Sequence, residues 1–312
     1  MSCLENLPNE LFEYIFQYFD LAELNESFYE LNSRFRSLLE SCSATHVCVR
    51  SNLSPEFISR FATRIQSLHI KNCQHRISLA PFASSLIKLV LGSSINLSYD
   101  ELSLLENLQY LDCVDDNICN NVSRQTKLQH LGIQYCHFEN KHDRFSLLKS
   151  LCLYDVRGKY VFDKIIVDLP HLTDLQIHDH YNKEYPSIPL NQIRTFPMIT
   201  NFRLYLRNGF HQTQIDWYFG HLPNIKLFHI EYFPCLVYPS WDGPYALLNF
   251  IAAAIEKYFH NLRRFSCLAA CEIRHNLPFD MTKIHSIYQE NHVEIYRNDN
   301  RLFEFYSKKN FV

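Results

Sequence analysis

Cysteine and histidine are the residue types through which this chain could do chemistry, because its 312 residues include 11 cysteines and 16 histidines. Cys267, Cys271 and His275 recur at every fourth position, a spacing that places three metal ligands on one side of a helix. The residues up to Cys267 follow a strand pattern instead, and a strand does not bring these three side chains together. We therefore expect no metal centre here.

The segment His178-Asp179-His180 offers two imidazoles for chelation, but no third ligand is evident nearby, so a turn at the surface is the favoured interpretation. The sequence has no pair of cysteines at zinc-finger spacing, no GxSxG motif, and only six glycines, too dispersed for a phosphate-binding loop. A cysteine nucleophile beside a histidine stays open, since only the fold assembles such pairs. We predict a protein with no catalytic residues, cofactor or metal.

The composition is that of a globular protein, with 47% hydrophobic and 14% aromatic residues. The net charge of −3 argues against a whole-chain basic field for nucleic acid. The charge is uneven: residues 1–41 contain eight acidic and two basic side chains, a charge of −6, so the other residues carry +3. A solvated helix face explains the acidic segment, and steering toward a basic partner is the alternative.

No secretory leader is expected, because Glu5 and Glu10 interrupt the place of a basic and then apolar segment. The sequence also lacks a run of 18 apolar residues. We therefore expect a soluble protein of the cytoplasm or nucleus, without a membrane association and with its cysteines reduced.

Residues 7–39 form a self-contained helical pattern. Leu7-Pro8 begins a helix whose apolar residues continue to Phe19 at helical spacing. Asp20 and Glu23 predict a capping box for a second helix, and Asn32 or Ser33 can cap a third. So small a unit leaves apolar surface exposed, which predicts that something else covers it.

These residues resemble an F-box, the trihelical module that docks on the Skp-type adaptor of a cullin ubiquitin ligase. The resemblance rests on LPNEL at 7–11, Ile15-Phe16, Phe19, Leu21, Leu24 and LNSRF at 31–35. Many members have Cys and Trp where this chain has Leu31 and Phe35. The resemblance implies adaptor contacts through eight apolar residues: Leu7, Pro8, Leu11, Ile15, Phe16, Leu24, Phe28 and Leu31. Leu7-Pro8 is the better candidate for partner contact, while Leu11 and Phe16 fit a place in the module's own core equally well.

From residue 43 onward, the form L-x-x-L-x-L recurs. Its central apolar residues stand at positions 68, 89, 111, 131, 151, 175, 202, 228 and 265, and residues 44–49 fit a degenerate first copy. Most of these spacings lie within or at the edge of the leucine-rich repeat period, and the interval of 37 needs an insertion. The polar turn position of that family is met by Cys73 and Cys136 alone.

The pattern resembles a divergent leucine-rich repeat solenoid, because stacked parallel strands bury one continuous apolar row. The predicted fold is α/β: an F-box-like helical module at 1–42, then at 43–312 a solenoid with a curved parallel sheet. Helical returns are expected after Ser54 and Ser98, a long helix at 245–259 accounts for the insertion, and a short helix reaches about residue 289. Segments 292–296 and 301–306 predict a terminal hairpin that caps the solenoid.

The alternating residues of each strand are expected on the concave face, where aromatic, arginine and charged side chains are suited to a protein ligand. The residues favoured for target binding are Tyr110, Asp112, His130, Arg203, Tyr205, His229 and Glu231. With the F-box resemblance, they imply a non-enzymatic substrate receptor of an SCF-type (Skp/cullin) ubiquitin ligase that brings an unidentified protein to degradation. The alternatives are a repeat scaffold that binds a partner without any ligase and a cysteine-dependent hydrolase.

Overall fold

The computed structural model describes most of the chain. The described residues are 7–16, 18–41, 46–49, 54–71, 78–92, 99–113, 127–134, 145–155, 162, 166, 169–179, 193–206, 212–232, 244–270, 294–298 and 302–306. The chain divides into two compact units, residues 1–133 and 134–312. Both contain parallel strands, and in each unit described helices or helical turns stand between some of the consecutive strands, so the fold is α/β.

The first unit begins with the helices α1 (Asn9–Phe16), α2 (Leu21–Phe28) and α3 (Ser33–Ser41). The predicted capping box of α2 is present, because the Glu23 amide donates to Asp20 (2.8 Å) and the Asp20 amide donates to Glu23 (3.1 Å). At the start of α3, the Phe35 amide donates to Asn32 Oδ1 at 3.0 Å. These N-terminal caps start α2 and α3 within a few residues of the end of the preceding helix.

Aromatic side chains fill the space between the three helices. The ring of Phe12 meets Phe35 edge to face with 4.9 Å between centroids, and Phe28 packs against both Phe16 and Phe35. Phe12, Phe16 and Phe35 are almost wholly buried. The helices therefore share a small core of their own.

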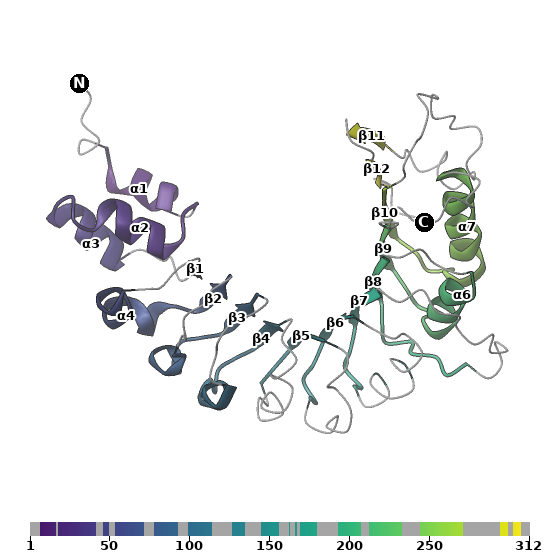
Figure 1. Ribbon diagram of the computed structural model, residues 1–312, viewed down its shortest axis with the longest axis horizontal. Helices are drawn as coiled ribbons and strands as arrows, with labels where there is room; N and C mark the ends of the chain where they lie inside the picture. Colours follow the sequence, from purple (N-terminus) through teal and green to yellow (C-terminus); the bar gives the residue numbers. More distant parts are fainter. Residues whose placement is uncertain are drawn as a thin grey trace. The chain divides into compact units, whose positions relative to one another are not determined.

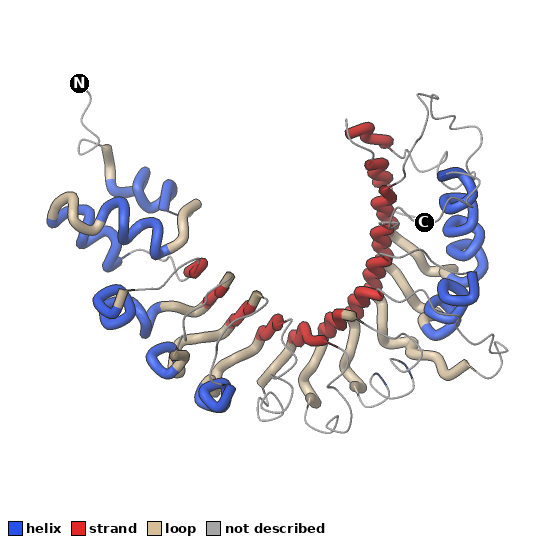
Figure 2. The backbone as a smooth tube through the Cα atoms, in the orientation of Figure 1, coloured by secondary structure: helices blue, strands red, loops and turns tan. Residues whose placement is uncertain are grey.

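The first unit continues with β1 (His46–Val49), α4 (Pro55–Phe61), β2 (Ser67–Ile70), β3 (Lys88–Leu91), β4 (Tyr110–Cys113) and β5 (His130–Gln134). Each strand is parallel to the next along the chain. The returning segments include α4, which Ser54 caps as predicted, and 3₁₀ helices at Ala62–Arg64, Ala80–Phe82 and Tyr99–Leu104. In this unit the helical returns lie on one side of the strands (Figure 2).

The register of these strands places the predicted repeat positions side by side. Val47 aligns with Leu68, which aligns with Leu89, and the row continues through Leu111 to Leu131. All five side chains have no solvent exposure. This row is the continuous apolar core that the repeated sequence predicted.

The second unit has parallel strands β6 (Ser150–Tyr154), β7 (Asp174–Asp179), β8 (Asn201–Leu206), β9 (Leu227–Tyr232) and β10 (Arg264–Ala270). Their central residues again align in one buried row: Leu151, Leu175, Phe202, Phe228 and Phe265. The predicted terminal hairpin is confirmed: β11 (Glu294–Asn298) and β12 (Leu302–Tyr306) are antiparallel, and β12 is also antiparallel to β10.

The helices α6 (Gln212–His221) and α7 (Pro244–Tyr258) lie on the same side of the strands of the second unit (Figure 1). The structure confirms the helix expected at 245–259, whereas α6 was not predicted. The Tyr258 hydroxyl donates to Asp216 at 2.8 Å, and Phe219 packs against Phe259. These contacts join the two helices over the apolar row.

Several predictions fall outside the described residues: the turn positions Cys73 and Cys136, the chelating candidate His180, the ligands Cys271 and His275, and the helix to about residue 289. Among the helices that the structure describes, we find none with the length and apolar character needed to span a membrane.

Candidate functional site

The eight residues implicated in adaptor binding differ in accessibility. Leu11 and Leu31 are 47% and 58% exposed, and Pro8 is also exposed. Leu7, Ile15 and Phe28 are half-buried. Phe16 and Leu24, at 2% and 0%, belong to the core of the three helices. Of these eight residues, Pro8, Leu11 and Leu31 are therefore the exposed ones. Leu11 is accessible at the surface, whereas Phe16 is not.

Arg34 links the two ends of the F-box-like segment. Its guanidinium donates to the carbonyl oxygen of Leu7 at 2.5 Å and to Asn9 Oδ1 at 2.6 and 2.9 Å. The chain entering α1 is thereby fixed to α3, so Leu7 and Pro8 have a defined position. Arg34 belongs to the LNSRF motif at 31–35, but the sequence alone did not predict this role for it.

Aromatic residues of the module are exposed as well, and the sequence reading did not select them for binding. Tyr14 and Tyr18 are 58% and 71% exposed, and Phe19 is also accessible. The Tyr18 hydroxyl donates to that of Tyr14 at 2.8 Å. Large exposed aromatic groups of this kind are typical of protein interfaces. Their helical spacing of four was visible in the sequence.

The module packs on the first repeat. The Cys48 amide of β1 donates to Asp20 Oδ2 at 3.3 Å, and Arg64 donates to the carbonyl oxygen of Leu39 at 3.0 Å. The guanidinium carbon of Arg60 lies 3.7 Å from the centroid of the Tyr29 ring. The three helices thus cover the β1 end of the strands in this unit.

The strand face is the side of the strands that carries the residues alternating with the buried rows. In the first unit, the rings of Tyr110 and His130 stack on it at 3.9 Å, nearly parallel, with Lys88 Nζ 4.5 Å from the Tyr110 centroid. The Asp112 carboxylate occupies the space beside Gly132 that a Cβ atom there would enter. Three of the predicted target-binding residues, Tyr110, Asp112 and His130, therefore lie close together.

In the second unit, a row of rings crosses the strand face. Tyr154 packs against His178 at 4.6 Å, and His178 stacks on Tyr205 at 4.1 Å. Burial and then the nearby Glu231 carboxylate raise the pKa of Tyr205, while Arg203 acts in the opposite direction. The Tyr205 hydroxyl therefore stays protonated at neutral pH. Arg203 is exposed on the same face.

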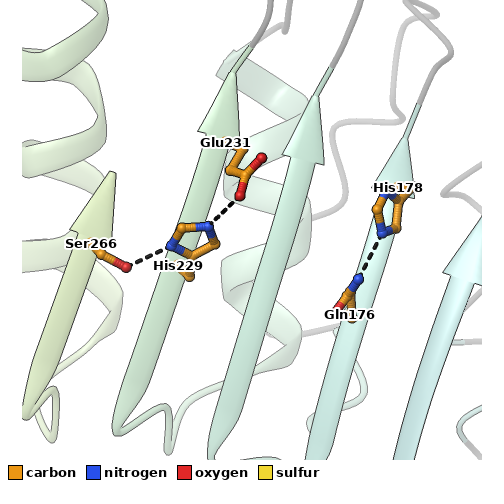
Figure 3. A network of polar contacts seen from close by, with 5 residues as sticks. All are labelled: Gln176, His178, His229, Glu231 and Ser266. Carbon is orange, nitrogen blue, oxygen red and sulfur yellow. Dashed lines mark hydrogen bonds and ion pairs between the residues drawn. The ribbon is translucent and has the colours of Figure 1, made fainter. Parts of the chain in front are cut away.

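A polar network continues this row on β9 and β10. His229 Nδ1 lies 2.6 Å from Ser266 Oγ, and His229 Nε2 lies 2.9 Å from Glu231 Oε1 (Figure 3). The His229 and Glu231 side chains are 25% and 23% exposed. Gln176 contacts His178 at 2.7 Å in the same view (Figure 3). The structure therefore brings His229 and Glu231 together and adds Ser266 to them.

Ser266 was not among the residues favoured for target binding in the sequence. Its position in the repeat could have indicated the contact. Ser266 follows Phe265 as His229 follows Phe228, and Phe228 aligns with Phe265 across the two strands. Equivalent positions of consecutive repeats become neighbours across parallel strands.

The described cysteines are mostly buried. Cys267 is buried in β10, which continues to Ala270, so the helical geometry required for ligation with Cys271 and His275 does not begin at Cys267. Cys113 and Cys152 are buried, and Cys48 is half-buried. No group of three or more potential metal ligands occurs within the part of the chain that the structure describes.

The chain was also compared with known proteins. It matches no protein-family model, and a search of curated proteins gave no significant match.

Proposed function

We propose that the chain is a substrate-recognition subunit of a Skp/cullin ubiquitin ligase, with an F-box-like module for the adaptor and a leucine-rich repeat-like solenoid for a protein target. The observation that carries the proposal is the combination of a trihelical N-terminal module with exposed Pro8, Leu11 and Leu31 and parallel strands whose repeat residues align in register.

The module supports adaptor binding through apolar area that its own core leaves uncovered. Burying the side chain of a leucine at an interface contributes on the order of 2 kcal/mol. Arg34 holds the entry to α1 in place, so Leu7 and Pro8 meet a partner without a large ordering cost. A cluster of such anchors is enough for a stable complex.

The strand faces support binding of a protein target. They carry Tyr110 with His130 in the first unit and Tyr205 with Arg203 in the second, residue types that anchor protein interfaces. In such a complex this chain contributes proximity: it raises the effective concentration of target lysines near the ubiquitin-transferring enzyme, and the enzyme performs the chemistry.

The test is binding to a purified Skp-type adaptor by the full chain and by a variant with Pro8→Ala and Leu11→Ala. Both side chains are exposed, so the variant should keep its fold while affinity falls at least about 100-fold, the equivalent of a few kcal/mol. Leu104→Ala is the matched control, because Leu104 is an exposed leucine outside the module. A folded parent chain that does not bind the adaptor would refute the ligase assignment.

A second function, a repeat scaffold without a ligase, is favoured by the contacts of the module with the first repeat. Asp20 accepts a hydrogen bond from the Cys48 amide, and Arg64 of the first return bonds to the carbonyl of Leu39. A helical cap that shields the first strand needs just such contacts. This function predicts that the folded chain has no affinity for a Skp-type adaptor.

A further inference from the structure

Ser266, His229 and Glu231 have the arrangement of a nucleophile, a base and a group that orients the base. The imidazole is contacted at both nitrogens: Ser266 Oγ lies 2.6 Å from Nδ1, and Glu231 Oε1 lies 2.9 Å from Nε2. A carboxylate that accepts the proton of Nε2 leaves Nδ1 as the acceptor for the serine hydroxyl. Figure 3 shows the three side chains in line across neighbouring strands.

The backbone fixes this arrangement. Ser266 and His229 are register partners on the parallel strands β10 and β9, and Glu231 lies two residues after His229, so that both point to the same face. Ser266, His229 and Glu231 are half-buried, which keeps them accessible to a small molecule while neighbouring side chains limit their rotation.

We propose that Ser266 is an activated nucleophile that accepts an acyl group from a carboxylic ester, with His229 as general base and Glu231 as its positioning residue. This activity goes beyond target recognition and does not depend on the proposed ligase function. The hydrogen bonds from nucleophile to base and from base to carboxylate are the structural signature of such a site.

The proposed step conserves atoms and charge. Ser266 Oγ forms a bond to the carbonyl carbon of the ester, and its proton passes to His229 Nδ1. The bond from that carbon to the leaving oxygen then breaks, and the imidazolium returns the proton to that oxygen, which departs as an alcohol or phenol. Water enters by the reverse sequence and releases the acid from the acyl-serine.

The surroundings favour an ester of an aromatic alcohol. The stacked rings of His178 and Tyr205 stand on β7 and β8, and the Tyr205 ring lies 5.9 Å from that of His229. An aryl leaving group can continue this row of rings. Arg203, the register partner of His229 on β8, adds an exposed cation to the same strand face.

The first unit contains an internal control. Ser67 Oγ lies 3.0 Å from His46 Nδ1 on the neighbouring strand, so a serine and an imidazole meet there as well. Among the described residues, no carboxylate contacts the ring of His46. If a carboxylate on the imidazole is required for activation, Ser266 is reactive and Ser67 is not.

The experiment exposes the folded chain to a fluorophosphonate, whose phosphorus forms a bond to serine oxygen as fluoride leaves, and locates the product by mass spectrometry. We expect Ser266 to be labelled at least about tenfold faster than Ser67, and 4-nitrophenyl acetate to be hydrolysed at a rate that Ser266→Ala abolishes. His229→Gln should slow labelling by about 100-fold or more, the usual contribution of a general base.

Glu231 needs a readout that separates positioning from structure. Glu231→Gln should lower the labelling rate at least about tenfold at an unchanged melting temperature, and Glu231→Asp should recover part of that loss because the carboxylate is restored. Equal labelling of Ser266 and Ser67, labelling that is insensitive to His229→Gln, or no labelling of the folded chain would each overturn the proposal. Adaptor binding is measured on the same variants and is expected to stay unchanged.

Discussion

At the scale of single residues, the strand face of the first unit places positive charges around His69. Burial, followed by the charges of Lys71, His46 and Lys88, lowers the pKa of His69 from its ordinary value of 6.5. Because the folded state resists protonation of this ring more than the unfolded chain does, the stabilising contribution is present above pH 6.5. It is lost as the pH falls through the lowered pKa of the folded state.

His69→Gln should therefore make the protein less sensitive to acid. The melting temperature is expected to fall between pH 7.5 and pH 5 in the parent chain and to fall less in the variant, because glutamine has no proton to take up. Thermal melts at matched ionic strength measure this difference. An identical decrease in both proteins would show that His69 does not contribute to acid sensitivity.

Single residues also show where sequence reasoning reaches its limit. The repeat pattern correctly predicted that His229, Glu231 and Tyr205 alternate with buried residues, because alternation is a local property of a strand. It could not predict that the hydroxyl of Ser266 contacts His229 Nδ1, since this depends on strand register and on side-chain rotamers 37 residues apart. The sequence likewise did not determine which apolar residues of the module are accessible. In the structure Leu24 is buried and Leu31 is exposed.

At the scale of elements, Asp20 serves α2 and β1 together. One carboxylate oxygen caps α2 by accepting from Glu23, and the other accepts from the Cys48 amide of β1. A helix cap typically contributes about 1 kcal/mol, and the bond to β1 adds to it. The capping residue therefore also joins the module to the strands.

Asp20→Ala should lower the free energy of unfolding by about 1–2 kcal/mol, because both bonds are lost. Urea denaturation followed by circular dichroism is the measurement, with Glu26→Ala as the control at an exposed acidic position of the same helix. If the two variants unfold at the same urea concentration, the hydrogen bonds of Asp20 to α2 and β1 do not contribute to the free energy of unfolding.

The helices also explain why part of the fold was predictable and part was not. α7 has an apolar stripe at helical spacing, with Ile251, Ala252 and Ile255 buried. This helix could therefore be predicted from the sequence. In α6 the consecutive residues Trp217, Tyr218 and Phe219 are all buried, and Gln214 of this helix donates to the buried carboxylate of Asp179. A helix that is buried on several sides does not show the alternation of apolar and polar faces that marks a helix in a sequence. For that reason α6 was not predicted.

At the scale of the whole molecule, the adaptor residues lie in one compact unit, whereas part of the proposed target-binding surface lies in the other. The adaptor residues Pro8, Leu11 and Leu31 belong to residues 1–133, whereas Arg203 and Tyr205 belong to residues 134–312. Substitutions at sites without shared partners usually act independently. The two binding functions should therefore be separable.

A variant with Arg203→Ala and Tyr205→Ala should bind a Skp-type adaptor within about twofold of the parent affinity, because its changes lie outside the module. Calorimetric titration of the purified proteins measures the affinity, and the variant with Pro8→Ala and Leu11→Ala shows the size of a direct effect. A large loss of adaptor affinity in the correctly folded Arg203 and Tyr205 variant would mean that the second unit takes part in adaptor binding.

The antiparallel pairing of β12 with β10 ends the series of parallel strands. A parallel strand edge such as that of β10 is a template on which another strand, from the same chain or a different one, can continue the stack. β12 occupies that template with the opposite chain direction, and β11 lies beyond it. Because β12 runs antiparallel to β10, another repeat cannot add to the β10 edge as the next parallel strand.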